Sequence, residues 1–230
     1  MPTIAFVSTK GGVGKTTSAL LLALGLAERG LDVSIVDSDP NLPLMAWSEL
    51  PGRPETIRLF HAPSFQDLPG ELRKAKQAAD WVVVDTEGGA PRMGGMAIAN
   101  ADLVITPLAA SRLDAREAKK VATMVAEISQ REKRAIPLVC LFARTPPPGR
   151  RSFQEVRAEL EAAGLPALSV ALGDKEAFRA LFSKGGALTG LSSREVSGLP
   201  AARALVDAYT AEVAAVVGAD APRRAARSAG

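Results

Sequence analysis

Short apolar runs alternate with longer segments of mixed polarity along most of the chain. The runs that we predict to be strands are Ile4–Ser8, Val33–Asp37, Thr56–Phe60, Trp81–Asp85, Leu103–Thr106 and Ile136–Ala143, with a short one near Leu168–Ala171. The segments that we predict to be helices are Thr16–Arg29, Leu42–Leu50, Ser64–Ala79, Arg112–Arg131, Ser152–Ala163, Asp174–Phe182 and roughly Pro200–Val217. Strands almost without polar residues are typical of sheets covered on both faces. The pattern therefore predicts an α/β fold with a mainly parallel, doubly wound sheet.

The chain shows no internal repeat and no long linker, so we expect residues 1–218 to form a single domain and 219–230 a flexible basic tail. A hydrophobic fraction of 47% and a charged fraction of 23% are ordinary for a folded protein. The formal charge of +3 resides in the tail, in Arg223, Arg224 and Arg227, because residues 1–220 hold 25 basic and 25 acidic residues. This balance excludes a uniformly basic, histone-like surface and leaves room for a local basic face.

Cysteine content and terminal sequence narrow the class of protein further. The single cysteine, Cys140, excludes a disulfide framework and a thiolate zinc site within one chain. The N-terminus lacks the charged segment and long apolar core of a secretory signal. The longest apolar run, Ala19–Leu24, is far shorter than the ~20 residues that span a bilayer. We therefore expect a cytoplasmic protein.

A glycine-rich segment lies between the first predicted strand and the first predicted helix. It reads Lys10-Gly11-Gly12-Val13-Gly14-Lys15-Thr16-Thr17. Successive glycines let backbone N–H groups converge on phosphate oxygens, and the following helix adds the positive end of its dipole. In such a loop Lys15 reaches the β- and γ-phosphates, and the Thr16 hydroxyl ligates Mg²⁺. The usual pattern has glycine at position 9, where this chain has Thr9 followed by the extra Lys10.

Aspartates end two of the predicted strands. Asp37-Ser38-Asp39-Pro40 closes the second strand, and Asp85 closes the fourth. Ligands of open parallel sheets bind outside the carboxyl ends of the strands, so these carboxylates should lie at the phosphate loop. Phosphoryl transfer to water needs a metal held by a carboxylate and a residue that orients the water. The sequence thus predicts a site for ATP and Mg²⁺.

The segment K-G-G-x-G-K-T resembles the deviant Walker A motif of the ParA/MinD ATPases, which belong to the nitrogenase iron protein-like P-loop NTPases. The resemblance implies an ATP-sandwich homodimer in which Lys10 crosses the interface to the partner's nucleotide and Lys15 acts in cis. It also implies that Asp39, in the first switch, positions the attacking water, with Asp37 in support. Asp85 matches the Walker B aspartate, so Thr16, Asp39 and Asp85 form the predicted metal site.

One departure follows the Walker B strand. Many ParA proteins have D-x-P-P there, whereas this chain has Asp85 followed by Thr86-Glu87-Gly88-Gly89. We expect the glycines to give this second switch more freedom. Together with Asp37-Ser38-Asp39-Pro40, the segment is similar to the small ParA-type subgroup that includes the accessory ATPase of T-DNA transfer.

The resemblance implies an ATPase that releases ADP and phosphate, binds DNA without sequence preference as a dimer, and positions a cargo on the nucleoid. A plasmid, a chromosome locus or a protein cluster such as chemoreceptors could be that cargo, and a ParB-like protein or cargo adaptor would stimulate hydrolysis. The residues that we expect to contact DNA are Arg150, Arg151, Arg157 and Lys184.

Other members of the group suggest different functions. A MinD-type membrane helix is not expected, because the tail lacks bulky apolar residues. An iron–sulfur cluster shared between subunits needs two cysteines per chain, which Cys140 alone does not supply. Two alternatives stay open: a DNA-transfer accessory ATPase that recognises one site, and an ATP-dependent ligase acting on a small molecule on the same fold.

Overall fold

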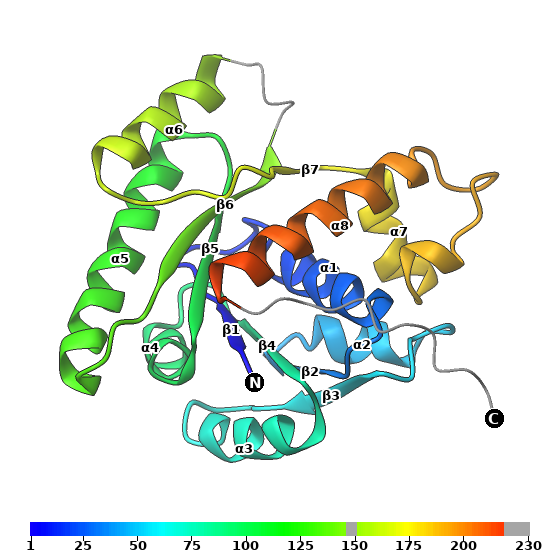
Figure 1. Cartoon of the computed structure of the whole chain (residues 1–230), viewed down its shortest axis with the longest axis horizontal. Helices are drawn as coiled ribbons and strands as arrows, with labels where there is room; N and C mark the ends of the chain where they lie inside the picture. Colours follow the sequence, from blue (N-terminus) through cyan, green and yellow to red (C-terminus); the bar gives the residue numbers. More distant parts are fainter. Residues whose placement is uncertain (146–150, 219–230) are drawn as a thin grey trace.

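A seven-stranded sheet with strand order β3-β2-β4-β1-β5-β6-β7 forms the centre of the molecule (Figure 1). The structure is a computed structural model that describes residues 1–145 and 151–218. All neighbouring strands pair in parallel. The strands are β1 (Thr3–Phe6), β2 (Val33–Ser38), β3 (Ile57–His61), β4 (Trp81–Thr86), β5 (Leu103–Leu108), β6 (Leu138–Thr145) and β7 (Leu172–Gly173).

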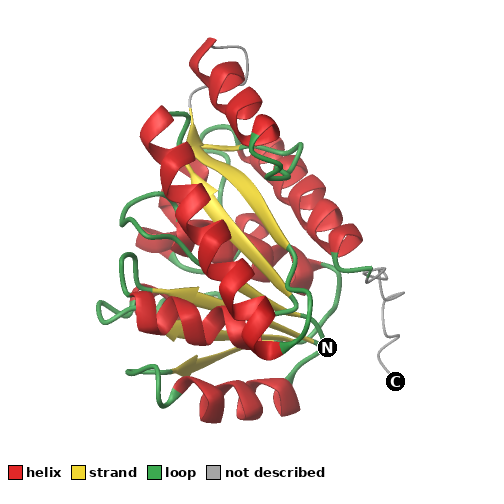
Figure 2. Ribbon diagram, turned by 90° about the vertical axis from the view of Figure 1, so that its left-hand side faces the viewer, coloured by secondary structure: helices red, strands yellow, loops and turns green. Residues whose placement is uncertain are grey.

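Helices cover both faces of this sheet, as Figures 1 and 2 show. The helices on one face are α1 (Lys15–Glu28), α2 (Pro43–Glu49), α7 (Glu176–Lys184) and α8 (Leu199–Val216), with the 3₁₀ turn η1 (Leu188–Gly190). Those on the other face are α3 (Leu68–Ala78), α4 (Pro91–Asn100) and α5 (Arg112–Glu132), and α6 (Arg151–Ala162) packs beside α5.

The strands read as uninterrupted apolar runs because each contributes to both cores. In β1, Ile4 and Phe6 pack with α1 and α8 in one core, whereas Ala5 belongs to the core under α3, α4 and α5. All three side chains are fully buried. The alternation of side chains along a strand thus requires apolar residues at every position. The predicted α/β class, with its doubly wound parallel sheet, is confirmed.

Three elements differ from the sequence prediction. No helix was predicted at α4, whose Gly94 and Gly95 weaken the helical pattern. A β-carbon at Gly94 would lie 3.2 Å from Val7 Cγ1, so the glycine permits close packing of α4 on the sheet. The strand expected near Leu168–Ala171 is instead β7, with an isolated bridge at Ala167 before it.

The third difference is the start of α3. The helix begins at Leu68 rather than at Ser64. The Ser64 hydroxyl oxygen instead accepts a hydrogen bond from the Asp67 N–H at 3.4 Å and donates one to the Asp67 carboxylate at 2.5 Å. These bonds form a turn that precedes the helix, so Ser64 is not its N-cap.

Sheet order determines where the predicted site residues meet. Strand β4 lies between β2 and β1, and Asp85 pairs in register with Asp37 on one side and Phe6 on the other. The carboxyl ends of these three strands therefore adjoin at one edge of the sheet.

Cys140 is buried in β6, where burial raises the pKa of its thiol to about 12. Within the described residues, no helix combines the length and apolar character that a membrane crossing requires.

Candidate nucleotide-binding site

The glycine-rich loop connects β1 to α1 at the carboxyl edge of the sheet. Gly12 and Gly14 have φ angles of 74° and 97°, in the left-handed region that glycine occupies without steric cost. Gly14 is also the N-cap of α1, and no side chain caps the first turn. The N–H groups of that turn are therefore available to an anion, as in phosphate sites at helix N-termini.

Lys15 places a buried cation beneath the loop. Its side chain is 6% exposed, and its Nζ donates to Ser8 Oγ at 3.2 Å and to the Lys10 carbonyl at 3.5 Å. Burial lowers the pKa of Lys15, and nearby carboxylates, chiefly Asp85, oppose this shift. Apart from these two neutral oxygens, the ammonium has no direct partner among the described residues, so an anion in the loop would complete its coordination.

Asp85 is the buried carboxylate next to this lysine. It is fully buried, and neither carboxylate oxygen has a hydrogen-bond partner within bonding distance in the described part of the chain. Burial raises the pKa of Asp85 to about 7, although the nearby Thr16 hydroxyl and Lys15 ammonium lower it. Two unpartnered oxygens beside a threonine hydroxyl fit an Mg²⁺ ion or its bound water, because Mg²⁺ takes oxygen ligands. The donor set therefore suits the metal that the sequence predicts.

Asp37 has a structural task at the start of α2. Its carboxylate accepts hydrogen bonds from the N–H groups of Leu44 at 2.9 Å, Met45 at 3.1 Å and Asp39 at 3.1 Å. The helix N-cap position, Leu42, supplies no side-chain bond, so Asp37 caps α2 from the preceding strand. Burial raises the pKa of Asp37, and the three backbone N–H groups act in the opposite direction. The carboxylate thereby fixes the segment that carries Asp39.

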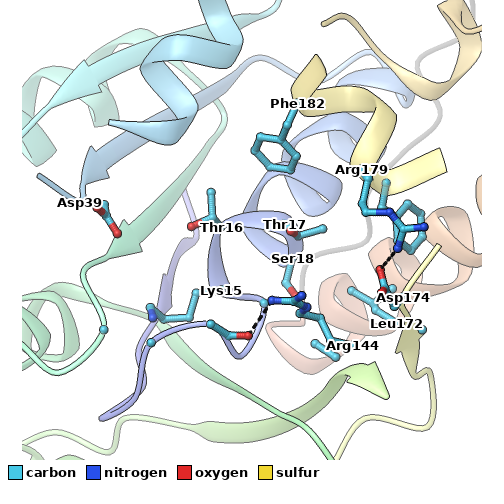
Figure 3. Close-up of a pocket in the computed structure, with 17 residues that line it drawn as sticks. Lys15, Thr16, Thr17, Ser18, Asp39, Arg144, Leu172, Asp174, Arg179 and Phe182 are labelled. Carbon is cyan, nitrogen blue, oxygen red and sulfur yellow. Dashed lines mark hydrogen bonds and ion pairs between the residues drawn. The ribbon is translucent and has the colours of Figure 1, made fainter. Parts of the chain in front are cut away.

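Asp39 lies at the cavity beside the loop, and Figure 3 shows it across from Thr16. Its Oδ1 accepts hydrogen bonds from the Asn41 N–H and from Asn41 Nδ2, both at 2.9 Å. These bonds hold the carboxylate on a turn anchored at one end by Asp37. The structure thus brings Lys15, Thr16, Asp39 and Asp85 to one site.

Helix α5 holds the first two residues of the loop. Lys10 Nζ lies 3.1 Å from Asp114 Oδ1, and the Thr9 hydroxyl donates to Glu117. Asp114 is 4% exposed, whereas the Lys10 side chain is 44% exposed. The sequence predicted no role at the loop for Asp114 or Glu117. Their spacing of three residues, one helical turn, is the only signal in the sequence that both could reach one loop.

A cavity of about 260 Å³ extends from the loop toward β7 and α7. Its far side is lined by Leu172, Asp174, Phe178, Arg179 and Phe182. Figure 3 shows Arg179 and Phe182 across the cavity from the start of α1. Arg179 Nη1 and Asp174 Oδ1 form an ion pair at 2.5 Å. The sequence did not predict this half of the site. Phenylalanines at i and i+4 of α7 share one helix face, but that spacing alone is equally typical of a core helix.

The loop after β4 packs directly on the phosphate loop. A β-carbon at Gly88 would lie 2.8 Å from Gly11 Cα, Gly11 N and the Lys10 carbonyl oxygen. The Gly89 N–H donates to the Ser8 carbonyl at 3.3 Å. Gly88 therefore permits a close backbone approach, a role that the expectation of a freer switch did not include.

The predicted DNA contacts lie on two helices that Figure 1 shows well apart, α6 and α7. Arg151 is 93% exposed and pairs with Glu155 at 2.9 Å, and Lys184 pairs with Glu195 at 2.7 Å. Arg157 lies on α6 and is partly buried. Arg150 and the tail at 219–230 lie outside the described residues.

Comparison with known proteins gives consistent results. A sequence model of the VirC1 protein family matches residues 1–218. A ParA protein of Rhizobium radiobacter is 31% identical over 196 residues, which cover 85% of this chain and 88% of that protein. The virC1 protein of Rhizobium rhizogenes is 30% identical over 190 residues, or 80% and 82% of the two chains.

A solved structure shares the fold. A variant of McdA from Cyanothece, in complex with ATP, matches with a TM-score of 0.69 and 18% identity, covering 96% of this chain and 97% of that chain. The fold and the loop thus define a P-loop protein of the ParA/MinD type. More specifically, this chain belongs to the VirC1 family.

Proposed function

We propose that the protein binds Mg²⁺-ATP in this cavity and hydrolyses it to ADP and phosphate. The observation that carries the proposal is the buried pair under the glycine loop, Lys15 and Asp85, which compensate each other only in part: within the described residues, Asp85 has no hydrogen-bond partner and Lys15 bonds only to neutral oxygens. Burying charged groups without partners costs several kcal/mol, on the order of the whole stability of a small domain. A protein retains such groups at a site where a bound ligand supplies the missing partners.

The residues divide the chemistry among them. The loop N–H groups and Lys15 would hold the β- and γ-phosphates, while Thr16 and Asp85 would hold Mg²⁺, directly or through water. The metal, when bound, neutralises charge that develops on the transferred phosphoryl group. Asp39 would orient the attacking water from the turn that Asp37 and Asn41 support. The Phe178 and Phe182 side of the cavity would receive the base.

Dimerisation would follow from ATP binding. In this state Lys10 is paired with Asp114 of its own chain and is 44% exposed. To reach a partner's nucleotide, Lys10 must leave Asp114 and exchange that carboxylate for phosphate. A shared nucleotide would make the exchange favourable, because a phosphate carries more charge than one carboxylate.

The dimer would bind DNA, and hydrolysis stimulated by a ParB-like or adaptor protein would release it. Such a cycle would position a cargo on the nucleoid of the cytoplasm. Arg151, Arg157 and Lys184 are the candidates among the described residues. Since Arg151 and Lys184 pair with Glu155 and Glu195, DNA phosphates would have to displace these carboxylates. Binding would therefore weaken strongly with salt.

The test is binding to a random-sequence DNA duplex with and without Mg²⁺-ATP. Asp39→Ala should retain ATP and bind DNA persistently, whereas Lys10→Ala should not bind. Lys74→Ala, which removes an exposed lysine on α3 that pairs with Glu71, is the matched control and should behave as wild type. If DNA is ignored in every nucleotide state, nucleoid positioning is wrong and small-molecule substrates become the alternative.

Membership of the VirC1 family favours a second candidate, an accessory ATPase of DNA transfer that recognises one site. Competition between random duplexes and duplexes from the transfer or partition region of the same genome distinguishes the two. Preference for one duplex would support the second candidate, and equal competition would support the first.

A further inference from the structure

One cation at the cavity has no part in the motif described so far. Arg144 lies near the end of β6 and lines the cavity beside the phosphate loop. Its Nη1 donates to the Gly12 carbonyl at 3.0 Å, the contact drawn as a dashed line in Figure 3. This bond connects Arg144 to Gly12, 132 residues away in the sequence, at the point where phosphates would bind.

The backbone of Arg144 is unusual for its residue type. Its φ of 52° lies in the left-handed region, which non-glycine residues occupy at a cost. Only three non-glycine residues in the described part of the chain share a positive φ, and the others are Leu42 and Lys133. Strained residues that persist cluster at functional sites, where the side chain is needed in that direction.

The contacts around Gly14 show why this direction matters. A β-carbon at Gly14 would lie 3.1 Å from Ala143 Cβ and 3.4 Å from Arg144 Cγ. The end of β6 therefore packs on Gly14, the N-cap of α1, and the aliphatic part of the Arg144 side chain lies against this residue. The guanidinium that follows lies over the segment from Gly12 to Gly14.

Within the described residues, the charge of Arg144 has no anionic partner. Among residues 1–145 and 151–218, its guanidinium bonds to the neutral Gly12 carbonyl and pairs with no carboxylate. By contrast, Lys10 in the phosphate loop forms an ion pair with Asp114. A guanidinium has five N–H donors in a planar fork that matches phosphate oxygens, and one of them is used here.

We propose that Arg144 is a nucleotide-binding residue that contacts the α- and β-phosphates from the β6 side of the cavity. The inference rests on the proposed function and adds to it a cation outside the loop motif. Because both phosphates are present in ADP and ATP, the side chain should contribute about equally to the affinity for each. Its effect on turnover at saturating ATP should be smaller than its effect on affinity.

The positive φ of Arg144 allows the side chain to be removed without strain in the backbone. Arg144→Gly and Arg144→Asn both tolerate the positive φ and remove the charge, so neither should weaken the fold. Lys133→Gly is the matched control, because Lys133 is also a cation at φ 52° but caps the far end of α5. Binding of ADP and of ATP with Mg²⁺ is measured by titration calorimetry, and the melting temperature is measured without nucleotide.

We expect both Arg144 variants to bind ADP and ATP about 10- to 100-fold more weakly, the loss of a charge-assisted hydrogen bond. Their melting temperatures without nucleotide should equal or exceed that of wild type, and Arg144→Lys should recover part of the affinity. Affinities within twofold of wild type would overturn the proposal, as would a loss confined to ATP. If neither wild type nor Lys133→Gly binds any nucleotide, the proposed function fails as well.

Discussion

At the scale of single residues, the site is defined by two buried charged groups: Lys15, which bonds only to neutral oxygens, and Asp85, whose carboxylate has no hydrogen-bond partner among the described residues. Lys15 and Asp85 both carry pKa values displaced toward their neutral forms, and burial is the main cause in each. In the absence of a ligand, the burial of both charged groups at the proposed nucleotide site lowers the stability of the protein. Removing one charge should stabilise the protein without ligand while abolishing the ligand's effect, a trade-off common at functional sites.

Asp85→Asn tests this trade-off through pH. Burial raises the pKa of Asp85 to about 7 in the folded state, far above its ordinary value. The folded state therefore binds the proton more tightly than the unfolded state, and stability falls as pH rises from about 4 to about 7. Asn stays neutral at every pH. The melting temperature of Asp85→Asn minus that of wild type should therefore be several degrees larger near pH 8 than near pH 5.

Thermal unfolding of both proteins without nucleotide at the two pH values provides the measurement. Adding Mg²⁺-ATP should raise the melting temperature of wild type and leave that of Asp85→Asn nearly unchanged. If the two proteins differ in melting temperature by the same amount at both pH values, the Asp85 carboxylate does not titrate as described.

At the scale of elements, three loops meet because three neighbouring strands end together. The phosphate loop follows β1, the Asp39 turn follows β2 and the Gly88 loop follows β4. Next to the Asp39 turn, Asp37 caps α2. Trp47 Nε1 in α2 donates to the Gly186 carbonyl at 3.3 Å, a long-range bond that connects α2 to the turn after α7.

Gly88→Ala tests the contact between the Gly88 loop and the phosphate loop. The new β-carbon would lie 2.8 Å from three backbone atoms of residues 10 and 11, so one of the two loops must move. Overpacking of this kind costs about 1–3 kcal/mol. We expect a lower melting temperature and at least a tenfold (about 1.4 kcal/mol) loss of ATP affinity.

Gly190→Ala is the control for this change, because a β-carbon there meets nothing within 4 Å. It should leave ATP affinity and melting temperature close to those of wild type. Wild-type affinity in Gly88→Ala would mean that the two loops do not depend on this close approach.

The sequence predicted the elements that have strong local signals. The apolar runs of β1, β2 and β4 and the glycine loop were identifiable because each pattern is contained in a few residues. Helix α4 was missed because Gly94 serves tertiary packing against Val7 rather than helix propensity. The grip of Asp114 and Glu117 on the loop, and the α7 side of the cavity, depend on contacts across more than 100 residues of sequence.

At the scale of the whole molecule, the central claim is an ATP-dependent change of state. The fold places the loop, the Asp39 turn and the exposed Lys10 at one edge of the sheet, where a second copy could share the nucleotide. Lys10 is held by Asp114 of its own chain in this structure. Dimer formation should therefore require ATP, Mg²⁺ and the release of Lys10.

Sedimentation velocity with Mg²⁺-ATP tests this claim most directly. Asp39→Ala with ATP should sediment as a dimer, and the same protein with ADP or without nucleotide should sediment as a monomer. Lys10→Ala introduced into Asp39→Ala should stay monomeric with ATP, whereas Lys74→Ala introduced into it should not prevent dimerisation. A species of the same size in every nucleotide state, with bound ATP verified, would contradict the account.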